Sequence, residues 1–147
     1  MKIISACLCG VNCAWNGQTK TSEKAIELVK KGEAIPVCPE QLGGLSTPRI
    51  PQEIQAGSGE DVLCCKCKVV NKNEEDVTAQ FIRGAEETLK IAKLIGATEF
   101  IAKSKSPSCG CGSTYDGTFS GTLITGDGVT TALLKQNGIK VISENGL

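Results

Sequence analysis

Short apolar runs and longer amphipathic stretches alternate along the chain. Four short runs are apolar enough to form buried strands: about 2–6, 33–37, 98–103 and 139–143. Three longer stretches, bounded by capping residues or glycines, predict helices: about 22–31, 77–95 and 128–136. Because strands and helices alternate, we expect an α/β fold with a mainly parallel sheet and flanking helices, in a Rossmann-like arrangement.

The segments between these elements are long and lack a regular period. Residues 38–59 are rich in Pro and Gly, and residues 104–120 are rich in Ser and Gly. Loops of this length in a compact domain are usually functional or disordered. Two short strands, 62–64 and 67–70, are predicted to form a hairpin or edge ribbon. No linker or repeat interrupts the pattern, so we expect one domain over residues 1–147.

Composition narrows the possible partners. The formal net charge is zero, with 16 basic and 16 acidic residues, and only 3% of the residues are aromatic. We therefore expect no binding to nucleic acid through a basic surface or a base-stacking platform. No run approaches the ~20 apolar residues of a membrane span. The first residues lack the apolar length of a signal peptide, so we expect a cytoplasmic protein with reduced thiols.

Nine cysteines and no histidine define the available chemistry. In a reducing compartment, so many cysteines indicate metal binding or thiol chemistry more than disulfides. The lack of histidine excludes a Cys–His nucleophile pair and a zinc site with His ligands. Any acid–base step must use another side chain.

Three cysteines follow predicted strands and precede turns: Cys7, Cys38 and Cys109. If these strands are neighbours in a parallel sheet, the three thiols meet at its carboxyl edge, where α/β sheets bind ligands. Thiolates close to glycine-rich backbone suit an iron–sulfur cluster. The spacing matches neither a ferredoxin nor a zinc knuckle. The alternative is that each cysteine is a small apolar residue of the core.

Several longer motifs point to a known family. They are SACL at 5–8, PVCPEQLGGL at 36–45, SPSCG at 106–110, YDGTFSG at 115–121 and GDGVT at 126–130. In content and order they resemble the DUF523 family over nearly the whole chain. The resemblance implies a 2-thiouracil desulfidase activity that depends on a [4Fe-4S] cluster held by only three cysteines. Three thiolates leave one iron open, and an open iron is a Lewis acid toward a thiocarbonyl sulfur without net redox change.

The resemblance also implies roles for individual residues. The family has cysteines at Cys7, Cys13, Cys38 and Cys109, which are four candidates for three ligand positions. We favour Cys7, Cys38 and Cys109 because they follow strands, with Cys13 as a supporting or catalytic thiol or as an alternative ligand. Glu40 is the candidate acid/base.

Further residues of the motifs are candidates for contact with the substrate. Ser106 and Ser108 precede Cys109 and are candidates for hydrogen bonds with the substrate or the attacking water, with Ser106 in a catalytic role. Tyr115 and Asp116 are candidates for the wall of the substrate pocket. The expected substrate is a small thiolated heterocycle, and we expect an air-sensitive cluster. The oligomeric state does not follow from the sequence.

The chain departs from the family in two respects. Ala14-Trp15-Asn16-Gly17 replaces the Arg-Tyr-Asp-Gly that often follows the loop cysteine, which affects expectations about specificity. Five cysteines look like additions: Cys9, Cys64, Cys65, Cys67 and Cys111. We favour surface or edge thiols over a second metal site for the group around Cys65.

Other features each allow two interpretations. Gly126-Asp127-Gly128 is either a phosphate-binding loop or a turn in which Asp127 caps a helix, and the turn is favoured. Arg49 and Lys103 either bind an anion or face solvent. Trp15 either stacks on a planar ring or covers the core. For the whole protein, the alternatives to a desulfidase are a non-catalytic iron–sulfur or metal-binding module and a reduced-thiol domain that binds a ligand.

Overall fold

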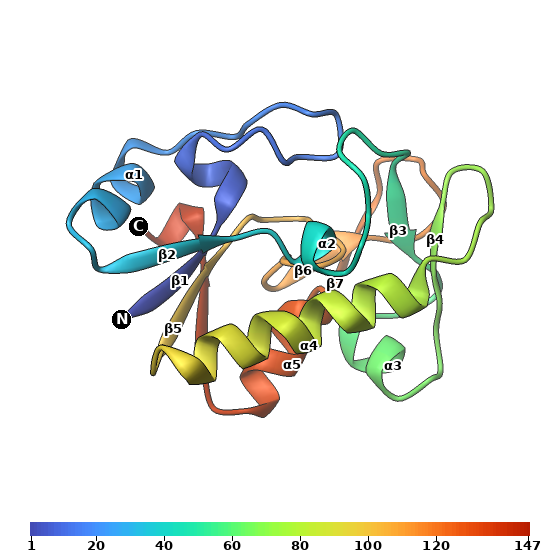
Figure 1. Cartoon of the computed structure of the whole chain (residues 1–147). Helices are drawn as coiled ribbons and strands as arrows, with labels where there is room; N and C mark the ends of the chain where they lie inside the picture. The colour runs from blue at the N-terminus through green and yellow to red at the C-terminus, as the bar shows by residue number, and fades with distance from the viewer.

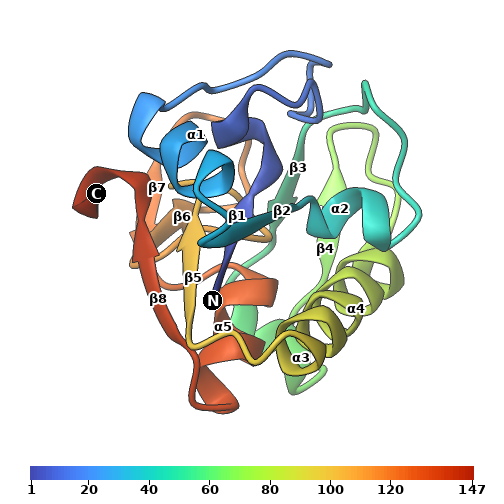
Figure 2. The same cartoon turned by 60° about the vertical axis from the view of Figure 1, so that its left-hand side comes forward.

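A four-stranded parallel sheet forms the centre of the protein. The computed structural model describes all residues, 1–147. The strands lie in the order β2-β1-β5-β8, with β1 at Lys2–Ser5, β2 at Ala34–Val37, β5 at Glu99–Ala102 and β8 at Lys140–Ser143. Helix α1 (Glu23–Lys30) covers one face, and α4 (Thr78–Leu94) and α5 (Val129–Gln136) cover the other (Figures 1 and 2). The expected α/β fold is confirmed.

Successive strand residues face opposite sides of the sheet. Ile3 and Phe100 pack with the apolar side chains of α4 and α5. Ile4 and Ile101 pack on the other face, against Ala25 of α1. All four strand residues are fully buried. A sheet covered on both faces needs strands that are apolar at every position, which is the pattern of the short runs in the sequence.

The order of the strands reverses beside β1. From β1 the chain crosses through α1 to β2 on one side, and later returns through α4 to β5 on the other side. Both β2 and β5 pair with β1 in parallel. The carboxyl ends of β1 and β5 therefore flank a topological switch point, which is the usual ligand site of an open α/β sheet.

Residues 38–77 and 103–128 contain further short elements. They are α2 (Pro39–Leu42), β3 (Gln52–Ile54), α3 (Gly59–Leu63), β4 (Val69–Asn71), β6 (Ser113–Tyr115) and β7 (Leu123–Thr125). Strands β3 and β4 form one antiparallel pair, and β6 and β7 form another. Two short 3₁₀ helices follow β1 and β8: η1 (Ala6–Cys9) and η2 (Glu144–Gly146). No helix of the protein combines the length and the apolar character that crossing a membrane requires.

The predicted hairpin at 62–64 and 67–70 is wrong in its first half. Residues 62 and 63 belong to α3, which begins with a capping box between Ser58 and Asp61. Val62 is fully buried in a cluster with Ile54 and Phe81. The second half is strand β4, but it pairs with β3 and not with its neighbour in sequence. The capping residues and the burial of one helical face outweigh the β-propensity of this short run.

Helix α2 lies directly on α4 because two glycines allow it. A Cβ on Gly43 would overlap the carbonyl of Gln80, and a Cβ on Gly84 would overlap the carbonyl of Pro39. Figure 1 shows α2 against the middle of the long helix. The contact fixes the position of the short helix that follows β2, and so of Glu40 in its first turn.

Candidate active site

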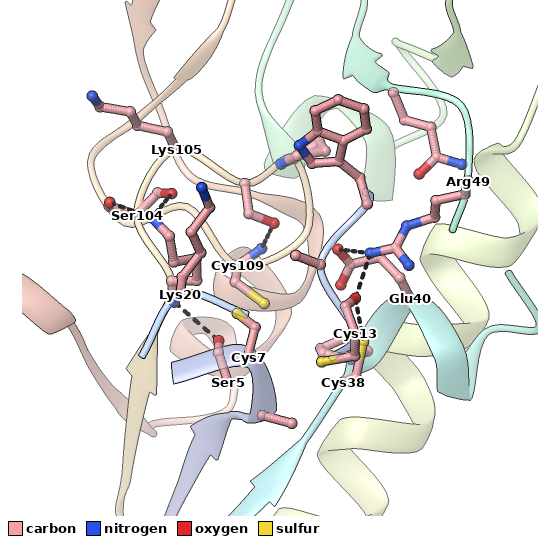
Figure 3. Close-up of a pocket in the computed structure, with 18 of the residues that line it drawn as sticks. Ser5, Cys7, Cys13, Lys20, Cys38, Glu40, Arg49, Ser104, Lys105 and Cys109 are labelled. Atoms are coloured by element: carbon pink, nitrogen blue, oxygen red, sulfur yellow. Dashed lines mark hydrogen bonds and ion pairs between the residues drawn. The ribbon is translucent and has the colours of Figure 1, made fainter. Parts of the chain in front are cut away.

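The carboxyl edge of the sheet opens into a pocket of about 550 Å³. Its walls include Cys7 after β1, Cys38 after β2 and Cys109 after β5, together with Cys13 from the first loop. Figure 3 shows these four cysteines around the floor of the pocket. Cysteines that are up to about a hundred residues apart in the sequence thus share one cavity, as the strand pattern predicts.

Local structure holds each strand-end cysteine in place. Cys7 lies in η1, where its carbonyl accepts a hydrogen bond from the Lys20 amide at 2.9 Å. Cys38 is the N-cap residue of α2, and Pro39 occupies the first helical position. Cys109 lies in a tight turn, and the Cys109 amide donates a hydrogen bond to Ser106 Oγ at 3.0 Å.

The start of α5 anchors the Cys109 turn. The amides of Val129 and Thr130 donate to the carbonyls of Pro107 and Ser108 at 2.9 Å, and Thr131 Oγ1 donates to the Cys109 carbonyl at 2.7 Å. The first amides of this helix are therefore occupied by the backbone of the turn. These amides position the Cys109 turn and are not available to bind a phosphate group.

Asp127 does not cap α5, contrary to the sequence prediction. The N-cap residue is Gly128, whose Cβ would overlap the Ser108 backbone. Asp127 instead accepts a hydrogen bond from the Gly112 amide at 2.8 Å and pairs with Lys135 at 2.9 Å. The glycine at 128 allows the helix to approach the cysteine turn closely.

Three thiols of the pocket, those of Cys13, Cys38 and Cys109, have raised pKa values. Burial, followed by the negative charge of Glu40, raises the pKa of Cys109. The hydrogen bond with Cys13 and burial raise the pKa of Cys38. The hydrogen bond with Cys38 lowers the pKa of Cys13, but its bond with Cys7, burial and nearby charges outweigh this and raise it to about 11. Thiolates at this site therefore require a cation close to the sulfurs.

The donor set fits an iron–sulfur cluster better than a single metal ion. No three cysteine or acidic side chains are grouped closely enough to bind one ion. A cluster takes each thiolate on a different iron atom, so it suits sulfurs that line a wider cavity. Its irons also supply the positive charge that these buried thiols lack.

Glu40 forms a nearly buried ion pair at the rim of the cysteines. Its Oε2 lies 3.2 Å from Arg49 Nη2, and the two side chains are only 13% and 6% exposed. Arg49 Nη2 also donates to the Cys13 carbonyl at 3.2 Å. Arg49 therefore neither faces solvent nor is free to bind an anion. It joins the carboxylate to the cysteine loop (Figure 3).

The other predicted substrate residues divide into two groups. Ser106 and Tyr115 line the pocket. Ser108 does not line it: this residue is 1% exposed and bonds to Thr130 Oγ1 at 2.8 Å. Asp116 also lies outside the lining, where its Oδ1 accepts a hydrogen bond from the Thr118 amide at 3.0 Å.

Three further residues line the pocket: Glu53, Lys103 and Trp15. Glu53 of β3 lines the pocket and is 9% exposed. Lys103 lies in the wall but pairs with Glu144 at 2.9 Å. Trp15 lines the pocket with half of its surface exposed, so it does not cover the core. The sequence offered no signal for Glu53, since it lies in a three-residue strand without a clear period.

None of the five additional cysteines lines the pocket. Cys64 and Cys65 are exposed. Cys67 Sγ donates to the Ala56 carbonyl at 3.5 Å, and Cys111 Sγ donates to the Val141 carbonyl at 3.7 Å. Cys9 lies at the end of η1 and is partly buried.

Comparisons with known proteins find similarity over the whole chain. The model of the family described as 2-thiouracil desulfurase matches residues 3–146. The uncharacterised protein YbbK of Bacillus subtilis (strain 168) is 54% identical over 147 residues, which are 100% of this chain and 97% of that protein. A solved structure of the [4Fe-4S]-dependent thiouracil desulfidase TudS (DUF523Vcz) is 43% identical. It matches with a TM-score of 0.87 over 99% of this chain and 91% of the other.

Proposed function

Because the chain belongs to the 2-thiouracil desulfurase family, we propose that it is a desulfidase that removes sulfur from a thiolated pyrimidine such as 2-thiouracil. The observation that carries the proposal is the single pocket shared by the cysteines that follow β1, β2 and β5. The reaction exchanges C=S for C=O: water supplies the oxygen, hydrogen sulfide leaves, and no electrons are transferred.

Three thiols of the pocket are proposed as cluster ligands: Cys7, Cys38 and Cys109. A [4Fe-4S] cluster held by three cysteines supplies one Lewis-acidic iron that has no protein ligand. Cys13, whose carbonyl accepts a hydrogen bond from Cys38 Sγ at 3.9 Å, is the fourth thiol and the alternative ligand. The dependence of TudS on a [4Fe-4S] cluster supports the choice of this cofactor.

Glu40 is the proposed acid/base. One of its oxygens is held by Arg49, and the side chain lines the pocket beside the cysteines. A carboxylate in this position can accept a proton from the attacking water and return it to a departing group. Arg49 keeps the carboxylate oriented because its guanidinium is also bonded to the Cys13 carbonyl.

Ser106 is the proposed hydrogen-bond donor toward the substrate. Its Oγ already accepts from the amides of Ser108 and Cys109 at 3.1 and 3.0 Å. The hydroxyl proton remains available to a group in the pocket. Trp15 and Tyr115 add flat apolar surface on which a planar heterocycle can rest.

Sulfide release from 2-thiouracil tests the proposal directly. Protein reconstituted with iron and sulfide under anaerobic conditions is expected to show the broad absorption of a [4Fe-4S] cluster and to release sulfide with uracil as co-product. Cys38→Ser and Cys109→Ser are each expected to lose most of the cluster. Cys65→Ser is the matched control, because Cys65 is exposed and outside the pocket; it is expected to retain cluster and activity.

Two results would contradict the proposal in different ways. Full cluster content in both Cys38→Ser and Cys109→Ser would show that the ligand assignment is wrong. A loaded wild-type protein that releases no sulfide from any thiolated pyrimidine would point instead to a non-catalytic iron–sulfur module. A protein that takes up no iron would point to a reduced-thiol binding domain.

A further inference from the structure

Glu53 is a buried carboxylate without a cationic partner. It lies on β3, lines the pocket and is 9% exposed, yet it takes part in no ion pair. Glu40 in the same pocket, by contrast, is paired with Arg49. A carboxylate removed from water is costly unless hydrogen bonds compensate it. The position of Glu53 therefore calls for hydrogen-bond donors around both of its oxygens.

The protein supplies donors to only one of these oxygens. Oε1 accepts hydrogen bonds from the amides of Gly117 and Phe119, at 2.9 and 3.2 Å. Oε2 has no protein partner. It is also not sealed in the interior, since Thr114 Oγ1 is the only fully enclosed side-chain oxygen or nitrogen without a partner. Oε2 is thus an acceptor that the protein leaves free, on a residue that lines the pocket.

The backbone fixes the direction of this acceptor. Gly117 has a φ of 91°, and a Cβ there would come within 2.6 Å of the Ile54 carbonyl oxygen. Only glycine allows the segment after β6 to lie this close to β3 and to point its amide at Glu53. The carboxylate is therefore held in one orientation before any ligand binds, which favours selective recognition.

We propose that Glu53 Oε2 accepts a hydrogen bond from a ring N–H of the substrate, so that the pocket selects heterocycles that carry N–H beside the thiocarbonyl. This inference rests on the proposed function, because that function places a thiolated pyrimidine in the pocket. An ionised carboxylate can only accept, and 2-thiouracil offers N–H on both sides of its C=S group. Glu53 is then a specificity-determining residue, separate from the acid/base Glu40.

The Glu53→Gln variant changes the hydrogen-bonding character of one atom while preserving the local structure. The amide oxygen can still accept from Gly117 and Phe119, and the NH₂ group replaces Oε2. A donor then faces the ring N–H where an acceptor stood. We expect kcat/KM for 2-thiouracil to fall about 10- to 100-fold, the range for a hydrogen bond to a charged group, with cluster absorption and melting temperature unchanged.

Methylated substrates make the test specific. Wild-type holoprotein is expected to discriminate at least about tenfold between 1-methyl- and 3-methyl-2-thiouracil, because only one ring N–H meets Glu53. In Glu53→Gln this discrimination is expected to shrink to about twofold, since the bond is absent for both isomers. Glu99→Gln is the matched control: Glu99 pairs with Lys2 at the opposite end of the sheet, and its variant should discriminate as wild type does.

Calorimetric measurement of the affinities of wild type and Glu53→Gln for the same compounds separates this inference from the proposed function. Discrimination that is absent in wild type, or equally large in Glu53→Gln, would overturn the role of Glu53 even if sulfide is released. Binding that shows the expected coupling without sulfide release would refute the desulfidase and leave Glu53 as the recognition residue. Wild-type holoprotein that binds none of the three compounds would refute both.

Discussion

Two carboxylates lie in the same pocket in opposite surroundings. Glu40 is bonded to the Arg49 guanidinium, whereas Glu53 is bonded only to neutral amides. A carboxylate beside a charged partner and a carboxylate bonded to neutral amides differ in their electrostatic surroundings, and so in the roles that they can take. We infer that the first handles protons and the second recognises the ring.

Replacement of Glu40 by Gln tests the first of these roles. The variant keeps the shape of the side chain but cannot accept a proton, so sulfide release is expected to fall about 100-fold or more. Cluster absorption should stay at the wild-type level, because Glu40 is not a proposed ligand. The measurement is single-turnover sulfide release by protein of matched cluster content.

The Glu40→Gln variant needs a control for its effect on stability. It leaves Arg49 buried with a weaker partner, so the melting temperature is also expected to fall. Assays well below that temperature separate the two effects. Glu86→Gln on the exposed face of α4 is the matched control and should match wild type in both measurements. Near-normal sulfide release from folded Glu40→Gln would exclude Glu40 as the acid/base.

At the scale of elements, the site depends on a helix that is too short to be stable alone. Helix α2 has four residues, far fewer than an isolated helix needs in water. Its position comes from the backbone contact with α4 at Gly43 and Gly84. The long helix therefore acts as the support for Cys38 and Glu40.

The Gly84→Ala variant tests this support, because the two effects of the substitution change the stability of the protein in opposite directions. Helix propensity alone predicts that alanine inside α4 raises the free energy of unfolding by about 1 kcal/mol. The overlap with the Pro39 carbonyl predicts a loss instead, of about 2 kcal/mol, together with reduced sulfide release as α2 moves. Denaturant unfolding decides between them, and Arg83→Ala on the exposed face is the control. A stabilised, fully active Gly84→Ala variant would disprove the role of this contact.

At the scale of the whole molecule, the end of β8 is joined to the pocket wall. Glu144 in η2 accepts hydrogen bonds from Lys103 Nζ, the Ser104 amide and Ser104 Oγ at 2.7 to 2.9 Å. The Lys103 amide in turn donates to Ser5 Oγ at 2.9 Å. Three strand ends around the switch point are thus tied together, and the residues before the Cys109 turn are held in place.

This network predicts how stability depends on pH. Burial alone would raise the pKa of Glu144, but the hydrogen bonds from Lys103 and Ser104 outweigh it and lower the pKa. A carboxyl with a lowered folded-state pKa stabilises the fold above its unfolded-state pKa, and this contribution is lost as the pH falls through the folded-state value.

Glu144→Gln should remove that contribution. At pH 7 the free energy of unfolding is expected to fall by about 2 kcal/mol, because charged hydrogen bonds are lost. Between pH 7 and pH 3 the variant should lose less stability than wild type. Denaturant unfolding across this range measures both effects, with Glu33→Gln, an exposed residue, as control. Parallel curves for wild type and Glu144→Gln would contradict the assignment.

The periodic pattern of apolar residues in the sequence determined the main strands and helices of the protein. Apolar runs such as 98–103 correspond to the strands, and the amphipathic stretch 77–95 corresponds to α4 at Thr78–Leu94. The meeting of Cys7, Cys38 and Cys109 also followed from the sequence, because the carboxyl ends of parallel neighbours share one edge. Periodicity and strand ends are local signals, so they can be recognised without coordinates.

Only the tertiary structure decided what surrounds those cysteines. Glu53 and the Gly117 amide are 64 positions apart, and no local pattern in a three-residue strand marks the carboxylate as buried. Residues 62–64 resembled a strand, but Val62 packs with Phe81 in the core as part of helix α3. A site made by contacts between distant residues depends on how the elements pack. The sequence by itself therefore determined where the thiols meet, and packing determined which charges and acceptors face them.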